Sequence, residues 1–307
     1  MLLLWPELAR GGHFGLAVSG GPDSTALLLL AAAAFPGRVE AATVDHALRP
    51  ESTSEAAFVA DLCDRLGVAH VTLKVVVEAG NIQSEARRAR YAALTSWCGE
   101  HGLEALVTAH HADDQAETLL LRLNRGSGVG GLAGVRARGL APDSTLPLFR
   151  PLLGWRKAEL ERVVAAAEIL PVQDPSNQND RFDRARLRKA LCSADWLDVA
   201  AIAESASHLA DADAALEWAA RREWTECVSE SGLGIIYRPQ APRAVALRVM
   251  ARIIAKLDGE EPRGGAVARV FDTLIARQPV SIGNLVARAT PNGWSFMPTP
   301  KRRVSSS

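Results

Sequence analysis

The sequence predicts an α/β protein with a doubly wound, mainly parallel sheet of the Rossmann-like kind, followed by a smaller and mainly helical C-terminal domain. Between residues 14 and 110, four short apolar runs alternate with longer helical patterns, an order that is typical of a parallel sheet. The runs lack polar alternation, as strands do when helices cover both faces of their sheet. The chain has 307 residues, about twice a common domain length, so a second domain is expected.

The four expected strands are the runs FGLAVS (14–19), VEAATV (39–44), AHVTLKVVV (69–77) and EALVTAH (104–110). The helical patterns between and after them cover residues 23–34, 52–66, 84–101 and 113–123. The glycine-rich stretch RGSGVGGLAGVRARGL (125–140) predicts a loop. Residues 156–168 then predict a further helix, and residues 174–191 predict a polar loop that enters an arginine-rich helix.

We expect the first domain to cover residues 1–195 and to be the catalytic one. An alanine-rich helical linker is expected over residues 196–230, and a small accessory domain over residues 231–307. In that last part, LGIIYR (233–238) predicts a strand, residues 242–257 and 264–277 predict helices, and residues 281–288 and 293–297 predict short strands.

The composition is that of an ordinary globular protein. Hydrophobic residues make up 48% and charged residues 23%, which excludes disordered and fibrous classes. The chain has no apolar run of the roughly 18 to 20 residues that span a membrane and no signal-peptide pattern, so we expect a cytoplasmic protein. The net charge is zero, so any nucleic-acid site must be a local basic patch. Cys63, Cys98, Cys192 and Cys227 form no close pair, which excludes a zinc cage or a redox dithiol and predicts buried, apolar roles.

The segment SGGPDS follows the first expected strand and contains Ser19, Gly20, Gly21, Pro22, Asp23 and Ser24. Its glycines allow a tight turn and its proline suits the first turn of a helix, so backbone amides can hold phosphate oxygens at the positive helix end. The hydroxyl groups of Ser19, Ser24 and Thr25 would add donors. Asp23 would repel a bare phosphate, which favours a magnesium ion between them. The lysine of a Walker-type loop is missing. The alternative is a Gly-Gly turn whose serine or aspartate merely caps the helix.

Polar residues also fall at the ends of neighbouring strands. Asp45 and His46 follow the second strand, and His110 and His111 follow the fourth. Ligands of open parallel sheets bind beyond the carboxyl ends of the strands, so we expect these residues to lie near SGGPDS.

The segment HHADDQAET places Asp113 and Asp114 at the start of a helix. The helix dipole favours carboxylates there in any protein, so simple capping is one interpretation. A zinc site is another, although no further ligand is evident. Two histidines at a strand end are not explained by capping, so contact with magnesium or substrate is preferred.

Two groups of arginines are candidates for binding phosphate. The first group contains Arg87, Arg88 and Arg90, next to Tyr91. The second group contains Arg181, Arg184, Arg186, Arg188 and Lys189. Either group can be an ordinary solvated helix face. In a neutral protein, such a dense second group also suits contacts with the phosphates of a nucleic acid.

Together, these motifs resemble those of the N-type ATP pyrophosphatases, and their order resembles the tRNA(Ile)-lysidine synthetase family in its short form. SGGPDS resembles the pyrophosphatase loop. The other matching stretches are VDHALRPES, ARRARYAAL, TAHHADDQAETLLLRLNRGSGVGGLAGV, RPLLGWRKAEL and DPSNQNDRFDRARLRKAL, within residues 14–191. The resemblance implies a PP-loop fold and a ligase that uses ATP and Mg²⁺, with L-lysine and a tRNA(Ile) bearing a CAU anticodon as partners. It also implies a reaction in two steps, in which the wobble cytidine is adenylated with release of pyrophosphate, and lysine then displaces AMP to form lysidine.

The resemblance implies that the SGGPDS loop holds the pyrophosphate end of ATP. Asp45 and His46 would contact the nucleoside, and Asp23 with Asp114 would hold the magnesium ion.

The expected catalytic residues are Asp23, Arg90, His110 and Asp114. Arg90 would neutralise phosphate charge, and His110 would orient the reacting base or amine or exchange a proton with it. The accessory domain would bind tRNA. Further tRNA-binding residues would be Arg122, Arg125, Arg184, Arg186 and Arg188.

The chain departs from the family at Phe182 and Ala185, where a tyrosine and an asparagine are usual, so any hydrogen bonds of those side chains are absent. Two rival functions are left open. One is another PP-loop tRNA-modifying enzyme such as a thiolase, which the position of the cysteines outside every site motif disfavours. The other is a non-catalytic ATP-binding module. The lysine-binding residues and a homodimeric state are also left open.

Overall fold

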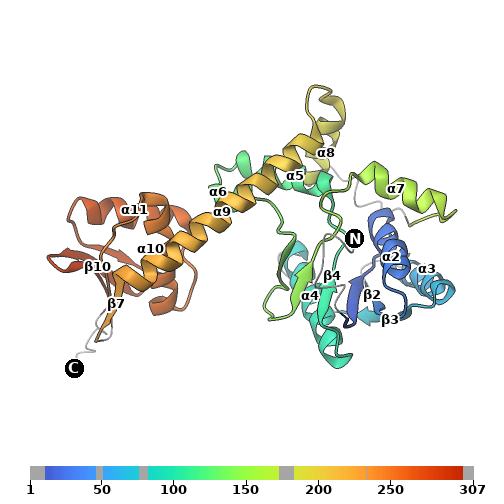
Figure 1. The fold of residues 1–307 in the computed structure, drawn as a ribbon, viewed down its shortest axis with the longest axis horizontal. Coiled ribbons are helices and arrows are strands. Elements are labelled where there is room, and N and C mark those ends of the chain that lie inside the picture. Colours follow the sequence, from blue (N-terminus) through green and yellow to red (C-terminus); the bar gives the residue numbers. More distant parts are fainter. Residues whose placement is uncertain (1–10, 46–50, 76–81, 173–182, 233, 300–307) are drawn as a thin grey trace, which may run out of the picture. The chain divides into compact units, whose positions relative to one another are not determined.

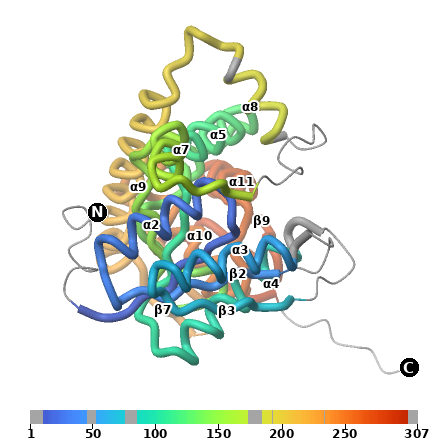
Figure 2. The backbone as a smooth tube through the Cα atoms, turned by 90° about the vertical axis from the view of Figure 1, so that its right-hand side faces the viewer, coloured from blue at the N-terminus to red at the C-terminus, as the bar shows by residue number. Residues whose placement is uncertain are grey.

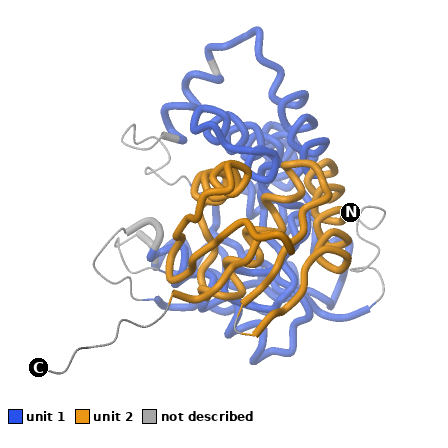
Figure 3. Tube along the Cα trace, turned by 90° about the vertical axis from the view of Figure 1, so that its left-hand side faces the viewer, with its two compact units in different colours: residues 1–210 blue, residues 211–307 orange. Residues whose placement is uncertain are grey.

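The computed structural model describes residues 11–45, 51–75, 82–172, 183–232 and 234–299. The chain forms two compact units, residues 1–210 and residues 211–307 (Figure 3). The boundary falls inside one continuous helix, α9 (Val199–Cys227). In the described part of the chain, no helix combines the length and apolar character needed to cross a membrane.

The first unit contains the predicted parallel sheet (Figure 1). The four predicted strands are present as β1 (Phe14–Ala17), β2 (Val39–Asp45), β3 (Ala69–Lys74) and β4 (Ala105–Val107). The strand order is β3-β2-β1-β4-β6-β5, in which β6 (Pro147–Phe149) pairs parallel to β4 and β5 (Arg138–Leu140) pairs antiparallel to β6. The last two strands were not predicted, because all three residues of β5 are exposed and β6 begins at Pro147, in a segment that prolines interrupt.

Helices cover both faces of this sheet, so it is doubly wound as predicted. Phe14, Leu16 and Val18 point into a core shared with α2 (Pro22–Ala34), α3 (Glu51–Leu66) and α7 (Lys157–Ala166). Ala17 points the opposite way, into a core shared with α4 (Ile82–Glu100). This alternation follows from the period of two along a strand. At Gly15 a Cβ would lie 2.5 Å from the Trp97 ring, so only glycine lets α4 pack this closely.

Two helices, α5 (Ala112–Leu123) and α8 (Asp183–Ser193), carry residues of the candidate site. α5 follows β4, and α8 packs against it (Figures 1 and 2). The glycine-rich stretch expected to be a loop contains a short helix, α6 (Val129–Leu132), and ends in β5.

The second unit is an α+β domain that contains the helices and strands predicted for the C-terminal part, with more strand than the words mainly helical imply. Its strands β7 (Val228–Ser231), β8 (Gly234–Tyr237), β9 (Val280–Ile282), β10 (Leu285–Thr290) and β11 (Gly293–Pro298) form an antiparallel sheet in the order β7-β8-β11-β10-β9. Helices α10 (Arg243–Asp258) and α11 (Gly264–Ile275) pack on this sheet.

A buried carboxylate fastens the end of α9 to this second core. Glu223 Oε1 accepts hydrogen bonds from the Tyr237 hydroxyl (3.1 Å) and from the backbone N–H groups of Gln240 (2.7 Å) and Ala241 (3.1 Å). Burial disfavours the charge of Glu223, but these donors outweigh it and lower the pKa of the carboxyl.

Candidate active site

The SGGPDS segment forms a tight turn between β1 and α2, as predicted. Ser24 Oγ accepts the Ser19 N–H (3.1 Å) and donates to the Gly21 carbonyl (3.1 Å). Thr25 Oγ1 donates to the Gly20 carbonyl (3.3 Å). The hydroxyl groups of Ser24 and Thr25 therefore bond within the turn in this structure, and their donation to a ligand stays a prediction.

The two glycines of the turn have different physical roles. Gly20 has a φ of +83°, where side chains are strained, and a Cβ there would lie 3.3 Å from Val172 and 3.4 Å from Val59. Its carbonyl also accepts the Val172 N–H at 2.9 Å. Gly21 has an ordinary φ of −69° and open space around its Cα. Gly20 thus allows the backbone conformation of the turn, whereas Gly21 leaves the outer face of the turn without a side chain.

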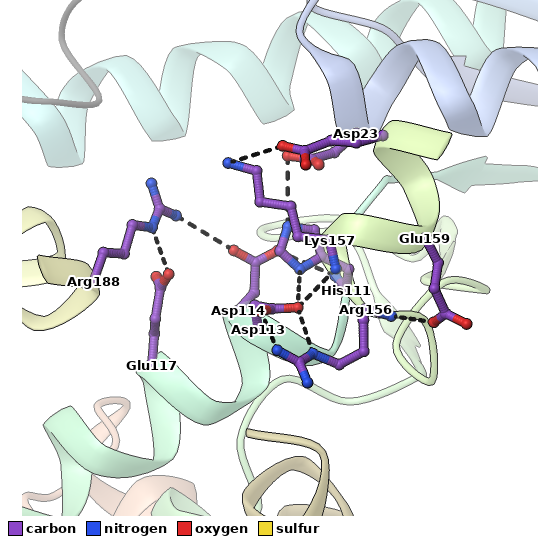
Figure 4. Close-up of polar contacts among 10 residues, drawn as sticks. Asp23, His111, Asp113, Asp114, Glu117, Arg156, Lys157, Glu159 and Arg188 are labelled. Carbon is purple, nitrogen blue, oxygen red and sulfur yellow. Dashed lines mark hydrogen bonds and ion pairs between the residues drawn. The ribbon is translucent and has the colours of Figure 1, made fainter. Parts of the chain in front are cut away.

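Three carboxylates surround the buried side chain of His111 (Figure 4). His111 Nε2 lies 3.5 Å from Asp23 Oδ2 and 3.6 Å from Asp114 Oδ2, and Nδ1 lies 3.6 Å from Asp113 Oδ2. Burial opposes a charge on the ring, but the carboxylates outweigh it and raise the pKa of His111 to about 10. The imidazolium therefore offsets the repulsion between carboxylates from two separate helices, α2 and α5.

Asp113 links the start of α5 to the start of α7. Its carboxylate accepts hydrogen bonds from Arg156 Nε (3.2 Å), Arg156 Nη2 (3.1 Å) and the Lys157 N–H (2.8 Å). Burial opposes ionisation, yet these donors and His111 hold the pKa of Asp113 well below its usual range. Asp113 is thus held by residues at the start of α7. Its neighbour Asp114 instead accepts the His111 N–H with Oδ2 (3.1 Å) and shares His111 Nε2 with Asp23.

Asp23 and Asp114, predicted to bind magnesium, converge beside the turn. One oxygen of each carboxylate contacts the same His111 nitrogen, and Asp23 Oδ1 is buried without a hydrogen-bond partner. Carboxylate oxygens are the ligands that Mg²⁺ prefers, and it usually keeps several waters and substrate phosphates as the others. Among the described residues, no three or more His, Cys, Asp or Glu side chains are arranged so that they could hold a metal ion by themselves. The residues present therefore fit a magnesium ion that is completed by phosphate and water.

His110 lies apart from the carboxylates, in a basic environment. Its Nδ1 is 3.0 Å from Thr108 Oγ1. Burial first, and then the positive charges of Arg150, Arg90, Arg87 and Arg184, lower its pKa to about 3. His110 is therefore neutral near pH 7. The sequence suggested Arg90 for this neighbourhood but did not single out Arg150.

Arg188 and Arg122, both predicted to bind tRNA, make hydrogen bonds within the protein. Arg188 Nε donates to Glu117 Oε1, and its Nη2 lies 3.7 Å from Asp114 Oδ1 (Figure 4). Arg122 Nη1 donates to the carbonyls of Gly131 (2.6 Å) and Gly134 (3.1 Å) and so holds the glycine-rich stretch. Both side chains are nevertheless only partly buried, so contact of either with tRNA stays a prediction. The side chains of Arg125, Arg184 and Arg186 are exposed.

The remaining predicted residues lie as follows. Asp45 is buried at the carboxyl end of β2, two strands from β4. His46, Arg181 and Phe182 lie outside the described residues. Ala185 is buried in α8. Cys63, Cys98 and Cys227 are buried and free, and each packs in an apolar core as predicted.

Comparison with known proteins agrees with this geometry. The PP-loop domain family matches residues 6–194, and the chain belongs to that family of nucleotide-binding domains. A U34-tRNA thiolase from Methanococcus maripaludis has the same fold, with a TM-score of 0.54, 15% identity and coverage of 65% of this chain and 72% of that one.

Relatives with curated names are more specific. The chain is 46% identical to the tRNA(Ile)-lysidine synthase of Novosphingobium aromaticivorans over 303 residues, which is 97% of this chain and 93% of that one. It is 39% identical to the same enzyme of Zymomonas mobilis, with 95% and 90% covered. The chain belongs to the tRNA(Ile)-lysidine synthase family.

Proposed function

We propose that this protein ligates lysine to the wobble cytidine of the CAU anticodon of tRNA(Ile). In the first step, the oxygen at the 2-position of the base attacks the α-phosphate of ATP, and pyrophosphate leaves. In the second step, the lysine amine attacks carbon 2 of the base, the C–O bond breaks with loss of AMP, and the amine proton is released. The family membership supports this reaction, and the convergence of Asp23 and Asp114 beside the pyrophosphate loop is the structural observation that carries it.

Each part of the site has a task in this proposal. Backbone amides of the SGGPDS turn bind the leaving pyrophosphate at the positive end of α2. Asp23 and Asp114 hold Mg²⁺, which when bound supplies positive charge to the phosphate oxygens. Asp45, at the end of β2, contacts the nucleoside of ATP.

Arg90 and His110 have the remaining two roles in this proposal. Arg90 is half-buried and offsets the negative charge that develops as AMP is transferred and released. His110 is neutral, because its pKa is about 3, so it orients the base or the amine through hydrogen bonds. Its bond with Thr108 Oγ1 fixes the ring. The exposed residues Arg125, Arg184 and Arg186, together with the second unit, would bind the tRNA.

A decisive test is to incubate the protein with ATP, radiolabelled lysine and total bacterial tRNA. We expect label to enter one tRNA species in proportion to the pyrophosphate released. Asp23→Ala and Asp114→Ala should abolish pyrophosphate release, whereas Asp61→Ala, an exposed substitution on α3, should leave it unchanged. Near-normal release by either site variant would refute the assigned roles.

The same assay separates the two rival functions. A non-catalytic ATP-binding module would bind ATP without releasing pyrophosphate. A thiolase would modify tRNA without any lysine, and the buried positions of Cys63, Cys98 and Cys227 in apolar cores disfavour it.

A further inference from the structure

A buried arginine that the sequence did not single out lies at the end of the site farthest from β2. Arg150 directly follows β6, and the Thr108 N–H donates to the Phe149 carbonyl at 3.0 Å, so Arg150 and His110 emerge from neighbouring strands. The residue is only 8% exposed. Its Nη1 donates to the Arg136 carbonyl at 2.6 Å, while its Nε is buried with no hydrogen-bond partner.

The surroundings of Arg150 add positive charge and no compensating carboxylate. Tyr91 lies beside it, and the guanidinium of Arg87 stacks over the Tyr91 ring at 5.0 Å from its centroid. Arg90 shares this neighbourhood. Among the described residues, no acidic side chain forms an ion pair with Arg87, Arg90 or Arg150. A buried guanidinium without a counter-ion has lost the favourable interaction of its charge with water, and a bound anion would compensate for that loss.

The order of the strands indicates which anion this is. Along the sheet, Asp45 follows β2, the pyrophosphate loop follows β1, His110 follows β4 and Arg150 follows β6. Adjacent strands lie about 4.8 Å apart, so a nucleotide that extends from the β2 end to the loop leaves Arg150 on the far side. In the proposed function that side receives the acceptor, which is a polynucleotide. A planar guanidinium matches phosphate oxygens in a bidentate manner.

We propose that Arg150, with Arg87 beside it, binds a backbone phosphate of the tRNA next to the wobble nucleotide and so holds the cytidine against the α-phosphate of ATP. This inference rests on the proposed function, because it takes tRNA as the acceptor. It assigns Arg150 to tRNA binding and not to ATP or to the carboxylate of lysine.

The test compares Arg150→Gln with Arg65→Gln in the full chain. Arg65 is exposed in the last turn of α3 and belongs to no predicted site, so it is a matched control. We expect Arg150→Gln to weaken tRNA affinity roughly 10-fold to 100-fold, as loss of a charged hydrogen bond does. The slope of log affinity against log salt should fall by about 0.7 to 0.9, the contribution of one phosphate. ATP affinity and the KM for lysine should stay at the wild-type values, and Arg65→Gln should change none of these quantities.

A second measurement replaces one phosphate on either side of the wobble nucleotide with a neutral methylphosphonate. For one of the two modified tRNAs, the wild type should bind it more weakly than it binds unmodified tRNA. Arg150→Gln should bind that modified tRNA and the unmodified tRNA equally well. If thermal unfolding shows that the Gln variant is misfolded, Arg150→Lys replaces it; the retained cation should preserve the salt slope while affinity falls.

Several results would overturn the inference. They are an unchanged salt slope in Arg150→Gln, additive effects of the variant and the methylphosphonate, and a loss confined to ATP or lysine. Failure of the proposed function is a separate outcome, because the wild type would then incorporate no lysine whatever the variant does.

Discussion

Arg188→Met should destabilise the protein by leaving Glu117 buried without its counter-ion. Glu117 is 2% exposed, its Oε1 is bound by Arg188, and its Oε2 has no partner. Burial already raises the pKa of Glu117, and Arg188 opposes that rise. Without the guanidinium, Glu117 must either remain charged in a dry site or take up a proton.

The cost is bounded by the cheaper of these two outcomes. Protonating a carboxyl of unfolded pKa near 4.3 at pH 7 costs at most about 3.7 kcal/mol, at 1.36 kcal/mol for each pH unit. Because the Arg188 side chain is 37% exposed, solvent already weakens the pair, and we expect a loss of about 2 to 3 kcal/mol. For a unit of this size the melting temperature should fall by about 4 to 12 °C.

The loss should depend on pH in a defined direction. Removing Arg188 raises the folded pKa of Glu117 further above its unfolded value, so the folded state holds the extra proton and stability falls as the pH rises through this range. At pH 5.5 the bound on the cost is about 1.6 kcal/mol. Thermal or denaturant unfolding at pH 5.5 and 7 measures the difference.

A double-mutant cycle supplies the control. Arg188→Met should be less destabilising in a Glu117→Gln background, because no charge is then left buried. Equal losses in both backgrounds, or a loss independent of pH, would refute this account. Arg184→Met should instead weaken tRNA binding without changing stability, because Arg184 is exposed.

Three further outcomes are expected. Gly20→Ala should lower the free energy of unfolding by about 1 to 2 kcal/mol, because alanine is strained in the left-handed conformation, and it should also lower ATP affinity. Gly21→Ala should fold normally. Equal melting temperatures for the two variants would contradict the different roles of the glycines. Glu223→Gln should destabilise the second unit at pH 7, and the difference from wild type should shrink as the pH falls through the lowered pKa of Glu223, which hydrogen exchange of that unit can follow. His110 should show no titration between pH 5 and 8 by NMR, since its pKa is about 3, and a midpoint near 6.5 would show that its buried, basic surroundings are described wrongly.

Much of the fold follows from local patterns. Four apolar runs without polar alternation predicted β1 to β4, and the turn residues of SGGPDS predicted the start of α2. Strands β5 and β6 escaped prediction because β5 is exposed throughout and β6 begins at a proline, so neither forms a buried apolar run like that of β4. The second sheet was underestimated, since β7 and β9 are only four and three residues long.

Within the site, the sequence indicated which residues could bind metal and phosphate better than it indicated which side chains contact one another. Asp23 and Asp114 were expected together and do converge. His111 was passed over in favour of His110, although His111 is the histidine among the carboxylates. Glu117 and Arg150 gave no signal, because a lone acidic residue in a helix and a lone arginine after a short strand are common everywhere.

The sequence by itself determined the order of strands and helices and the gathering of polar residues at the carboxyl ends of the strands, because both depend on short-range periodicity and on rules of parallel sheets. Only the tertiary structure decided which of two residues that are close in sequence contacts a given distant side chain. His110 and His111 are adjacent in sequence, yet one lies among arginines and the other among carboxylates. Likewise Arg186 is exposed while Arg188 binds Glu117, 71 residues away. Side-chain direction and contacts between distant segments are set by packing, which no local pattern encodes.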